Sequence, residues 1–191
     1  MYKRQLTDYK HLPELIKASS ARAPYGVMAD PEFPLQPVQD GAAVISNKRG
    51  FYRMTEFNSY GLVMNKQIVS QEEIVNGHTA KTIRIERLAQ NLTLFLLSAR
   101  KFLNRLSFGG PLYFRFKMNN TRALRALLGA KQATVLEDYL RLDRSLALCD
   151  LQARLPEMLE DILHEAAWSL GVQTDAQEMK TLLKSYLDEA H

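Results

Sequence analysis

A long amphipathic helix is the feature that most constrains the fold of this 191-residue chain. Apolar residues recur at three- and four-residue spacing between Thr82 and Leu106, which predicts one helix with one face against a core. These apolar residues are Ile85, Leu88, Leu92, Phe95, Leu96, Ala99, Phe102, Leu103 and Leu106. Gly109-Gly110-Pro111 is expected to end the helix, because glycine adopts the left-handed cap and proline cannot continue a helix. The neighbouring segments are therefore expected to form a sheet backed by this helix.

A strand is predicted directly after the helix. Apolar residues alternate with polar ones from Leu112 to Met118, and this period of two is typical of a strand with one buried face. Tyr113, Arg115 and Lys117 are expected to point away from the core, which places an aromatic ring and two cations on one face of the sheet.

Three strands are predicted before the helix, at Ala42–Ser46, Gly50–Phe57 and Tyr60–Val69. β-branched and aromatic residues are frequent there, and the short turns between the segments favour an antiparallel meander. Asn76-Gly77 marks a loop before the helix. The predicted order is β-β-β-α-β.

The N-terminal part is predicted to hold one short helix and an extended lead-in. The helix lies around Leu12, Leu15 and Ile16, with Pro13 tolerable in its first turn. Ala23–Asp40 contains four prolines, each of which fixes φ and removes a hydrogen-bond donor, so this stretch should wrap the surface in extended form.

From Thr121 onward the sequence predicts only helices. Thr134-Val135-Leu136-Glu137 and Thr174-Asp175-Ala176-Gln177 both match the capping box, in which two side chains satisfy backbone donors at a helix start. Apolar stripes over residues 158–170 and 179–187 indicate two further helical faces. Short connections between these segments favour an antiparallel three-helix bundle.

The predicted fold class is α+β: an antiparallel sheet with a long amphipathic helix and a C-terminal helical bundle. Residues 1–128 are expected to form the α+β domain with its lead-in, and residues 129–191 the helical bundle packed on or beside it. Apolar residues between Val135 and Leu155 would surround much of a helix, so this helix would need a second cover. The cover could come from the same domain, from a partner protein or from a second copy.

Charge is distributed unevenly along the chain, whose net charge is +4. Residues 1–110 hold 15 Lys and Arg against 9 Asp and Glu, whereas residues 111–191 hold 10 against 12. No acidic residue occurs from Arg87 to Leu136, although nine Lys and Arg fall there. Such a run is compatible with an ordinary solvated basic surface or with an anionic partner such as nucleic acid.

The sequence predicts a nucleic-acid-binding surface on the helix, the strand after it and the segment that follows. One flank of the helix is mostly polar and positive and could follow a phosphate backbone, whereas the strand offers base stacking and phosphate contact. The candidate residues are Arg84, Arg87, Arg100, Lys101, Arg105, Tyr113, Arg115, Lys117, Arg122 and Arg125.

The sequence gives no support for a cofactor, a metal site or a membrane anchor. Cys149 is the only cysteine, which excludes an internal disulfide, fits a reducing compartment and predicts a cytoplasmic location. It falls in a predicted amphipathic helix, where a buried apolar role is expected. The four histidines share no metal-ligand spacing, and the glycines form no phosphate-binding loop. No stretch is apolar enough to span a bilayer, and Met1–Lys10 lacks the apolar core of a signal peptide.

Four stretches carry a family resemblance: the Asp40-Gly41 turn, the Gly50-Phe51-Tyr52-Arg53 strand, the apolar helix Asn91–Leu106 and the strand start Gly110-Pro111-Leu112-Tyr113. Over roughly Ala21–Leu128 the chain resembles the region that follows the Schlafen AlbA-like domain in bacterial proteins regarded as DNA-binding. That family carries its DNA-associated or nuclease-like domain upstream, and no segment here matches it. The resemblance implies an accessory module in a defence or mobile-element setting, and it assigns no catalytic residue.

Three functions remain open from the sequence. The leading hypothesis is a non-enzymatic binding or assembly subunit that engages nucleic acid, or a nucleic-acid-handling complex, through the basic surface. The second is a protein scaffold or homo-oligomer that uses the C-terminal helices to bind its partner. The third is an enzyme with Glu72, Glu73 and His78 in a mobile loop, since loops often carry function.

Overall fold

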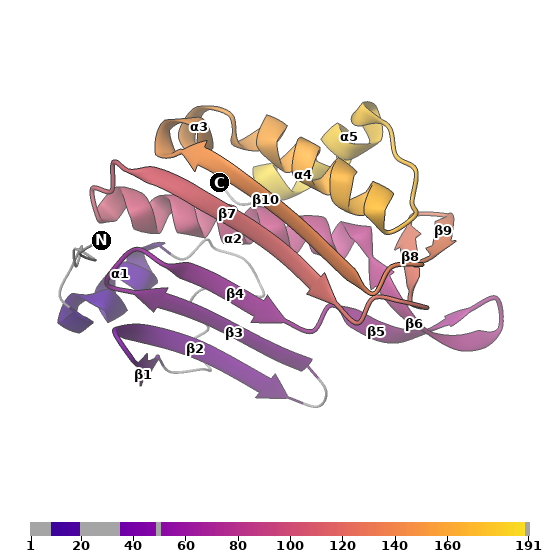
Figure 1. Cartoon of the computed structure of the whole chain (residues 1–191), viewed down its shortest axis with the longest axis horizontal. Coiled ribbons are helices and arrows are strands. Elements are labelled where there is room, and N and C mark those ends of the chain that lie inside the picture. The colour runs from indigo at the N-terminus through magenta and orange to yellow at the C-terminus, as the bar shows by residue number, and fades with distance from the viewer. Residues whose placement is uncertain (1–8, 20–34, 49–50, 190–191) are drawn as a thin grey trace. The chain divides into compact units, whose positions relative to one another are not determined.

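The structure is a computed structural model that describes residues 9–19, 35–48 and 51–189. It contains both helices and antiparallel sheets, so the predicted α+β fold class is confirmed. The chain divides into two compact units: unit 1 holds the described residues up to Ile68 together with Leu94–Gly109, and unit 2 holds Val69–Thr93 and Gly110–Glu189. Figure 1 labels the helices and strands of both units. Most of the predicted lead-in lies outside the described residues.

The predicted long helix is confirmed as α2 (Ile85–Arg105), which contributes its first part to unit 2 and its second part to unit 1. Its end differs from the expectation. Ser107, not Gly109, takes the left-handed conformation, with φ 51°. Phe108 N donates to Leu103 O at 3.1 Å and Ser107 N donates to Asn104 O at 3.0 Å, a pair of bonds that closes the last turn.

Unit 1 contains a four-stranded antiparallel sheet in the order β1-β2-β3-β4. The strands are β1 (Gln36–Val38), β2 (Gly41–Lys48), β3 (Phe51–Asn58) and β4 (Val63–Gln67). The expected three-strand meander is therefore confirmed as β2 to β4, and β1 adds an edge strand. Pro37 fits this edge because it has no N–H to give to a further strand.

The core of unit 1 joins this sheet to α2 and to the N-terminal helix. A short 3-10 turn η1 (Tyr9–His11) leads into α1 (Leu12–Ser19), as the sequence predicts. Phe57 of β3 and Phe102 of α2 are fully buried with ring centroids 5.0 Å apart, within the range of a favourable aromatic pair. Leu12 and Ile16 of α1 are also fully buried, so one amphipathic face of α1 belongs to the core.

Unit 2 contains a second four-stranded sheet in the order β5-β6-β8-β9. The strands are β5 (Ser70–Val75), β6 (His78–Arg84), β8 (Arg125–Leu128) and β9 (Lys131–Thr134); β6 and β8 run parallel and the other neighbours antiparallel. Asn76-Gly77 is therefore not a loop before the helix but the two-residue turn of the β5–β6 hairpin. Both residues have positive φ, 53° and 81°, as such hairpin turns require.

The remaining strands of unit 2 form a two-stranded antiparallel ribbon of β7 (Pro111–Asn119) and β10 (Tyr139–Ala147). The expectation that the chain is all helix from Thr121 was wrong, because β8, β9 and β10 lie there. The Thr134-Val135-Leu136-Glu137 tetrad does not start a helix: Thr134 ends β9. The apolar residues between Val135 and Leu155 do not surround a helix either, so the need for a second cover loses its basis.

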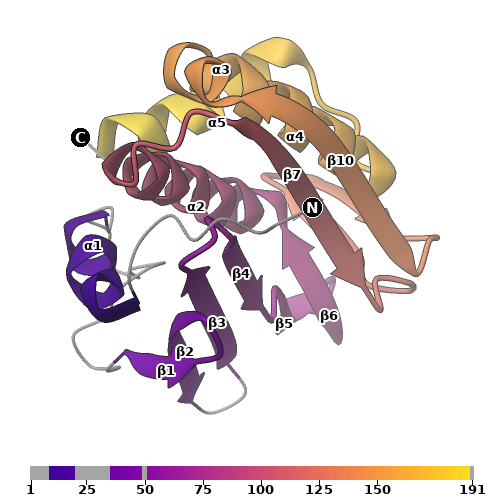
Figure 2. The same cartoon turned by 60° about the vertical axis from the view of Figure 1, so that its left-hand side comes forward.

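Three helices follow the ribbon: α3 (Leu148–Ala153), α4 (Leu155–Ser169) and α5 (Ala176–Glu189). Figure 2 shows α3 and α4 beside β10, and α4 packs against α5. The C-terminal helical region is confirmed but begins at residue 148, and the expected boundary after Leu128 falls between two paired strands. Asp175 rather than Thr174 caps α5, since its Oδ1 accepts a hydrogen bond from Glu178 N at 2.7 Å.

Two further expectations concern single residues and membrane spans. Cys149 was expected to be buried, but it lies on the exposed side of the short helix α3. None of the described helices is both long and apolar enough to cross a membrane.

Gly41 supplies a test of how β2 pairs with β3. A Cβ atom at Gly41 would collide with the backbone carbonyl oxygen of Phe57, which a side-chain rotation cannot relieve. We expect Gly41→Ala to lower the free energy of unfolding by about 1–3 kcal/mol in urea titrations, the usual effect of overpacking. Gly109→Ala is the matched control, because no atom lies within 4 Å of its added Cβ. Equal stability of the two variants would contradict the register of β2.

Candidate nucleic-acid interface

The outward face of the β7–β10 ribbon brings polar and aromatic side chains of the two strands together. Residues directly opposite each other on paired strands share one face of a sheet. We define the ribbon face as the four pairs Tyr113↔Ser145, Arg115↔Asp143, Lys117↔Arg141 and Asn119↔Tyr139. Asp143 is half-buried and the other seven residues are exposed.

The inward face of the ribbon holds this arrangement in place. Phe114 and Met118 of β7 are buried, and so are Leu140 and Leu142 of β10. Both α3 and α4 pack against β10. Because side chains alternate strictly between the two faces, a one-residue slip of β10 would bury its charged residues and expose its leucines. The apolar side therefore fixes which residues face outward.

A carboxylate at the centre of the ribbon face organises two arginines. Arg115 Nε donates to Asp143 Oδ1 at 2.8 Å, and Arg141 Nε donates to the other oxygen, Oδ2. Burial raises the pKa of Asp143, but hydrogen bonds from Arg115, Tyr113 and Arg141 outweigh this effect and hold the pKa at about 2. Asp143 is therefore ionised at neutral pH, and both guanidinium groups are held against the sheet.

The Tyr113 ring lies against one of these arginines. Arg115 Cζ is 5.1 Å from the ring centroid, and Arg115 Nη2 donates to the Tyr113 hydroxyl at 2.8 Å. Both contacts order the ring, and the first is a cation–π interaction. Tyr113 nevertheless remains 59% exposed, and Tyr139 on the partner strand is 48% exposed.

Lys117 and Arg141 face each other directly across the ribbon. Like charges in directly opposed positions destabilise a sheet. Arg141 has Asp143 as a partner, whereas Lys117 makes no ion pair with any residue in the described part of the chain. The ribbon face thus carries three cations and one carboxylate, and the repulsion between Lys117 and Arg141 is compensated only in part, through the contact of Arg141 with Asp143.

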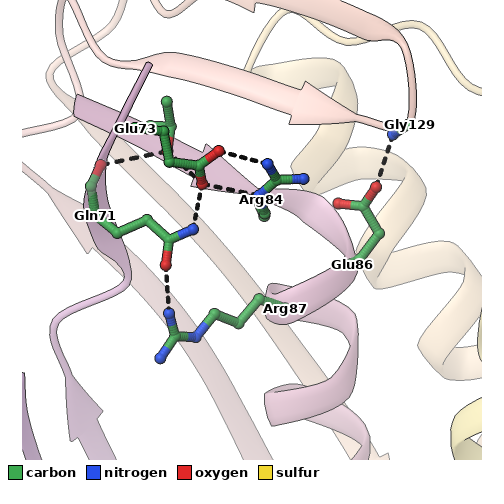
Figure 3. Close-up of polar contacts among 7 residues, drawn as sticks. Gln71, Glu73, Arg84, Glu86, Arg87 and Gly129 are labelled. Atoms are coloured by element: carbon green, nitrogen blue, oxygen red, sulfur yellow. Dashed lines mark hydrogen bonds and ion pairs between the residues drawn. The ribbon is translucent and has the colours of Figure 1, made fainter. Parts of the chain in front are cut away.

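Two other predicted residues, Arg84 and Arg87, hold the β5–β6 hairpin (Figure 3). Arg84 Nε donates to Glu73 Oε1 at 2.8 Å, and Arg84 Nη2 pairs with Glu73 Oε2. Hydrogen bonds from Arg84, and then from Gln71 and Thr82, outweigh burial and lower the pKa of Glu73 to about 2. Arg87 Nη1 donates to Gln71 Oε1 at 2.6 Å. These contacts tie α2 and β6 to β5.

The residues of the enzyme hypothesis lie on the same hairpin. Glu72, Glu73 and His78 do not lie in a loop but on the strands of the hairpin. Glu73 is engaged by Arg84, and His78 is paired with Val75 next to the turn. Within the described residues, no cluster of three or more His, Cys, Asp or Glu is placed to hold a metal ion.

Helix α2 also contacts the turn between β8 and β9 through a carboxylate. Glu86 in the first turn of α2 accepts a hydrogen bond from Gly129 N at 2.7 Å (Figure 3). Gly129 has φ 55° and occupies the turn between β8 and β9, where its missing side chain permits that conformation. A negative side chain in the first turn also favours the helix dipole of α2.

The other predicted cations have partners of their own. Arg122 Nε donates to Leu136 O at 3.2 Å, and Arg125 Nη1 donates to Gln132 Oε1 at 3.4 Å. Lys131, from the same acid-free run, pairs with Glu178 at 2.6 Å. A run without acidic residues in the sequence is therefore not free of acidic neighbours in the structure.

Three predicted residues belong to unit 1, whereas the ribbon face belongs to unit 2. Arg100 and Lys101 are half-buried on α2, and Arg105 Nη2 donates to Ala18 O at 3.0 Å. The structure thus brings together Tyr113, Arg115 and Lys117 among the ten predicted residues. It adds Tyr139, Arg141 and Asp143, which the sequence analysis missed. The alternation of apolar and polar residues from Tyr139 to Ala147 is the sequence signal that could have identified them.

The Glu73–Arg84 pair generates a pH-dependent prediction. The Glu73 pKa lies at about 2 in the folded protein against an ordinary value of 4.5, so its contribution is complete above pH 4.5 and lost as the pH falls to about 2. Because the Arg84 side chain is 43% exposed, solvent screening limits the effect. We expect Glu73→Gln to lower the free energy of unfolding by at most about 1 kcal/mol at pH 7.

This difference from wild type should shrink as urea titrations are repeated between pH 4.5 and pH 2, since protonation of Glu73 removes from the wild-type protein the ion pair that the variant lacks at every pH. Glu72→Gln is the control, because Glu72 is exposed on the same strand. A Glu73→Gln deficit that stays constant with pH would show that the ion pair is not its cause.

Comparison with protein-family models, with curated proteins and with solved structures finds no match to this chain. The resemblance to the region after the Schlafen AlbA-like domain therefore stays a prediction. Any function proposed for the ribbon face must accordingly rest on the chemistry of its own residues.

Proposed function

We propose that this chain is a non-enzymatic binding subunit that engages nucleic acid through the ribbon face. The observation that carries the proposal is the composition of that face: two exposed tyrosines, three cations and a single carboxylate on one side of a two-stranded ribbon. Aromatic rings and cations on one exposed sheet face are what base stacking and phosphate contact require.

Phosphate attraction also relieves a repulsion within the fold. Lys117 and Arg141 oppose each other across the strands, and a negatively charged phosphate between them would attract both and offset their repulsion. Asp143 lowers the net charge of the face to +2, but it orders Arg115 and Arg141 before any ligand arrives. Ordering a charged side chain in advance reduces the entropy lost on binding.

The proposal is narrower than the basic surface predicted from the sequence. Arg84 and Lys131 are paired with Glu73 and Glu178, and Arg87 is bound to Gln71. Cations engaged in this way contribute less to an outside partner, because binding would have to break or share their existing contacts. Among the residues that the structure describes, Lys117 makes no ion pair, so the ribbon face is the centre of the proposed interface.

Titration of labelled DNA and RNA at several salt concentrations tests the proposal, with Lys117→Glu as the decisive variant. We expect wild-type affinity to fall as salt rises, by about 0.9 log units per log unit of salt for each duplex phosphate contact and about 0.7 for each single-strand contact. Lys117→Glu should weaken binding and lower this slope. Its free energy of unfolding should be unchanged or slightly raised, because Glu at position 117 would face Arg141.

Lys184→Glu on α5 is the matched control, since it makes the same charge change at an exposed position away from the ribbon. It should leave binding near the wild-type value. The proposal fails if wild-type protein binds neither DNA nor RNA, if binding is independent of salt, or if both variants weaken it equally.

Replacing Asp143, the central carboxylate of the ribbon face, is expected to raise nucleic-acid affinity, whereas Lys117→Glu is expected to lower it. Asp143→Asn removes the one negative charge of the ribbon face and releases Arg115 and Arg141 from it. We expect the gain in positive charge to outweigh the lost ordering of the two arginines, so that nucleic-acid binding becomes tighter and its salt dependence steeper in the same titration. Asp188→Asn on α5 changes the same charge at an exposed site elsewhere. Equal affinity gains in both variants would indicate a general charge effect rather than a contact at the ribbon face.

A further inference from the structure

We infer that the ligand of the ribbon face is a single-stranded nucleic acid whose bases stack on Tyr113 and Tyr139. This inference rests on the proposed function and specifies its substrate class. The shared chemistry is an extended sugar–phosphate strand with unpaired bases, which single-stranded DNA and single-stranded RNA both supply.

The first argument is the environment of Tyr113. Arg115 lies over the ring and also donates to its hydroxyl, so the ring is ordered in the free protein. The ring is still 59% exposed, which leaves room for a flat partner against it. A base placed there would complete a stack of base, tyrosine and guanidinium. Bases inside a duplex are already stacked on their neighbours and do not offer this plane.

The second argument is the order of side chains along the ribbon. Tyr139 lies opposite Asn119, six residues along β7 from Tyr113, so the two tyrosines are separated by about 20 Å at about 3.3 Å per residue. Arg115, Lys117 and Arg141 occupy the space between them. A strand lying along the ribbon would therefore meet an aromatic ring, then cations, then a second aromatic ring.

The third argument is the charge beyond the second tyrosine. Glu137 and Asp138 directly precede Tyr139, and both are exposed. A duplex presents phosphates at fixed spacing along both strands, so it would carry some of them toward these carboxylates. A flexible single strand can instead direct a base at Tyr139 and keep its phosphates near the central cations. The arrangement thus disfavours a rigid duplex more than a single strand.

The experiment compares four probes of equal length: single-stranded DNA, single-stranded RNA, a DNA duplex and an abasic DNA strand with the same phosphates but no bases. Full-length protein is titrated at one salt concentration with each probe. We expect both single strands to bind more tightly than the duplex and the abasic strand. The ratio between the DNA and RNA strands distinguishes the two sources of the ligand.

Variants then assign the difference to the two rings. Tyr113→Leu and Tyr139→Leu should each reduce single-strand affinity by about 5- to 150-fold, the range found when a stacking aromatic side chain is removed. The salt slope should stay unchanged, because no charge is lost. Tyr113→Phe and Tyr139→Phe should retain most of the affinity, and none of the four changes should affect binding of the abasic strand. Trp168→Leu is the control, since it removes an aromatic side chain that is 64% exposed on α4.

The outcomes distinguish the inference about single strands from the proposed nucleic-acid-binding function. If the duplex binds as tightly as the single strands, or if the leucine variants bind single strands as wild type does, the inference is overturned while the proposed function stands. The same holds if the phenylalanine variants lose as much affinity as the leucine variants, because the affinity would then depend on the tyrosine hydroxyl groups and not on ring stacking. Absence of binding to every probe would overturn the proposed function itself. Unfolding of each variant in urea confirms that the losses do not arise from loss of the fold.

Discussion

The packing of the inner side of the β7–β10 ribbon is the interaction on which the proposed interface depends. Leu140 and Leu142 are 8% and 4% exposed, and burying such side chains stabilises a fold by roughly 1.5–3 kcal/mol each. They fix the register of β10 against β7 and thereby place every polar residue of the two strands. The buried leucines therefore determine which polar side chains face outward. The position of the candidate site is set by residues that do not contact a ligand.

The distribution of charge in space differs from its distribution along the chain. Residues 148–191 contain three Lys and Arg against nine Asp and Glu. Some of these carboxylates reach back to the strands of unit 2: Glu165 pairs with Arg144, and Glu178 pairs with Lys131. Arg144 and Lys131, two cations of unit 2 that lie next to the C-terminal helices, are therefore paired with carboxylates. The ribbon face points away from the buried side of the sheet, and Asp143 is its only carboxylate.

The sequence predicted those parts of the fold whose signal is local. The spacing of apolar residues identified α2, and the alternation from Leu112 to Met118 identified β7 and the outward direction of its polar residues. The later strands were missed because a four-residue capping motif outweighed the period of two at Tyr139–Ala147. For the same reason only three of the eight residues of the ribbon face, Tyr113, Arg115 and Lys117, were predicted. Which residue of β10 faces Lys117 depends on pairing between segments more than 20 positions apart, and no local pattern contains that information.

The pair of Lys117 and Arg141 also bears on why such a face would exist. Neither position is constrained by the core, because both side chains are exposed, so an acidic or neutral residue would fit at position 117 and remove the repulsion. The carboxylate of Asp143 compensates this repulsion only in part, since it is shared between Arg115 and Arg141. This one shared carboxylate is enough to order two guanidinium groups, but it does not neutralise the three cations of the ribbon face. A ribbon optimised for its own stability would not need this arrangement, whereas a ribbon that receives a polyanion gains from every cation left uncompensated.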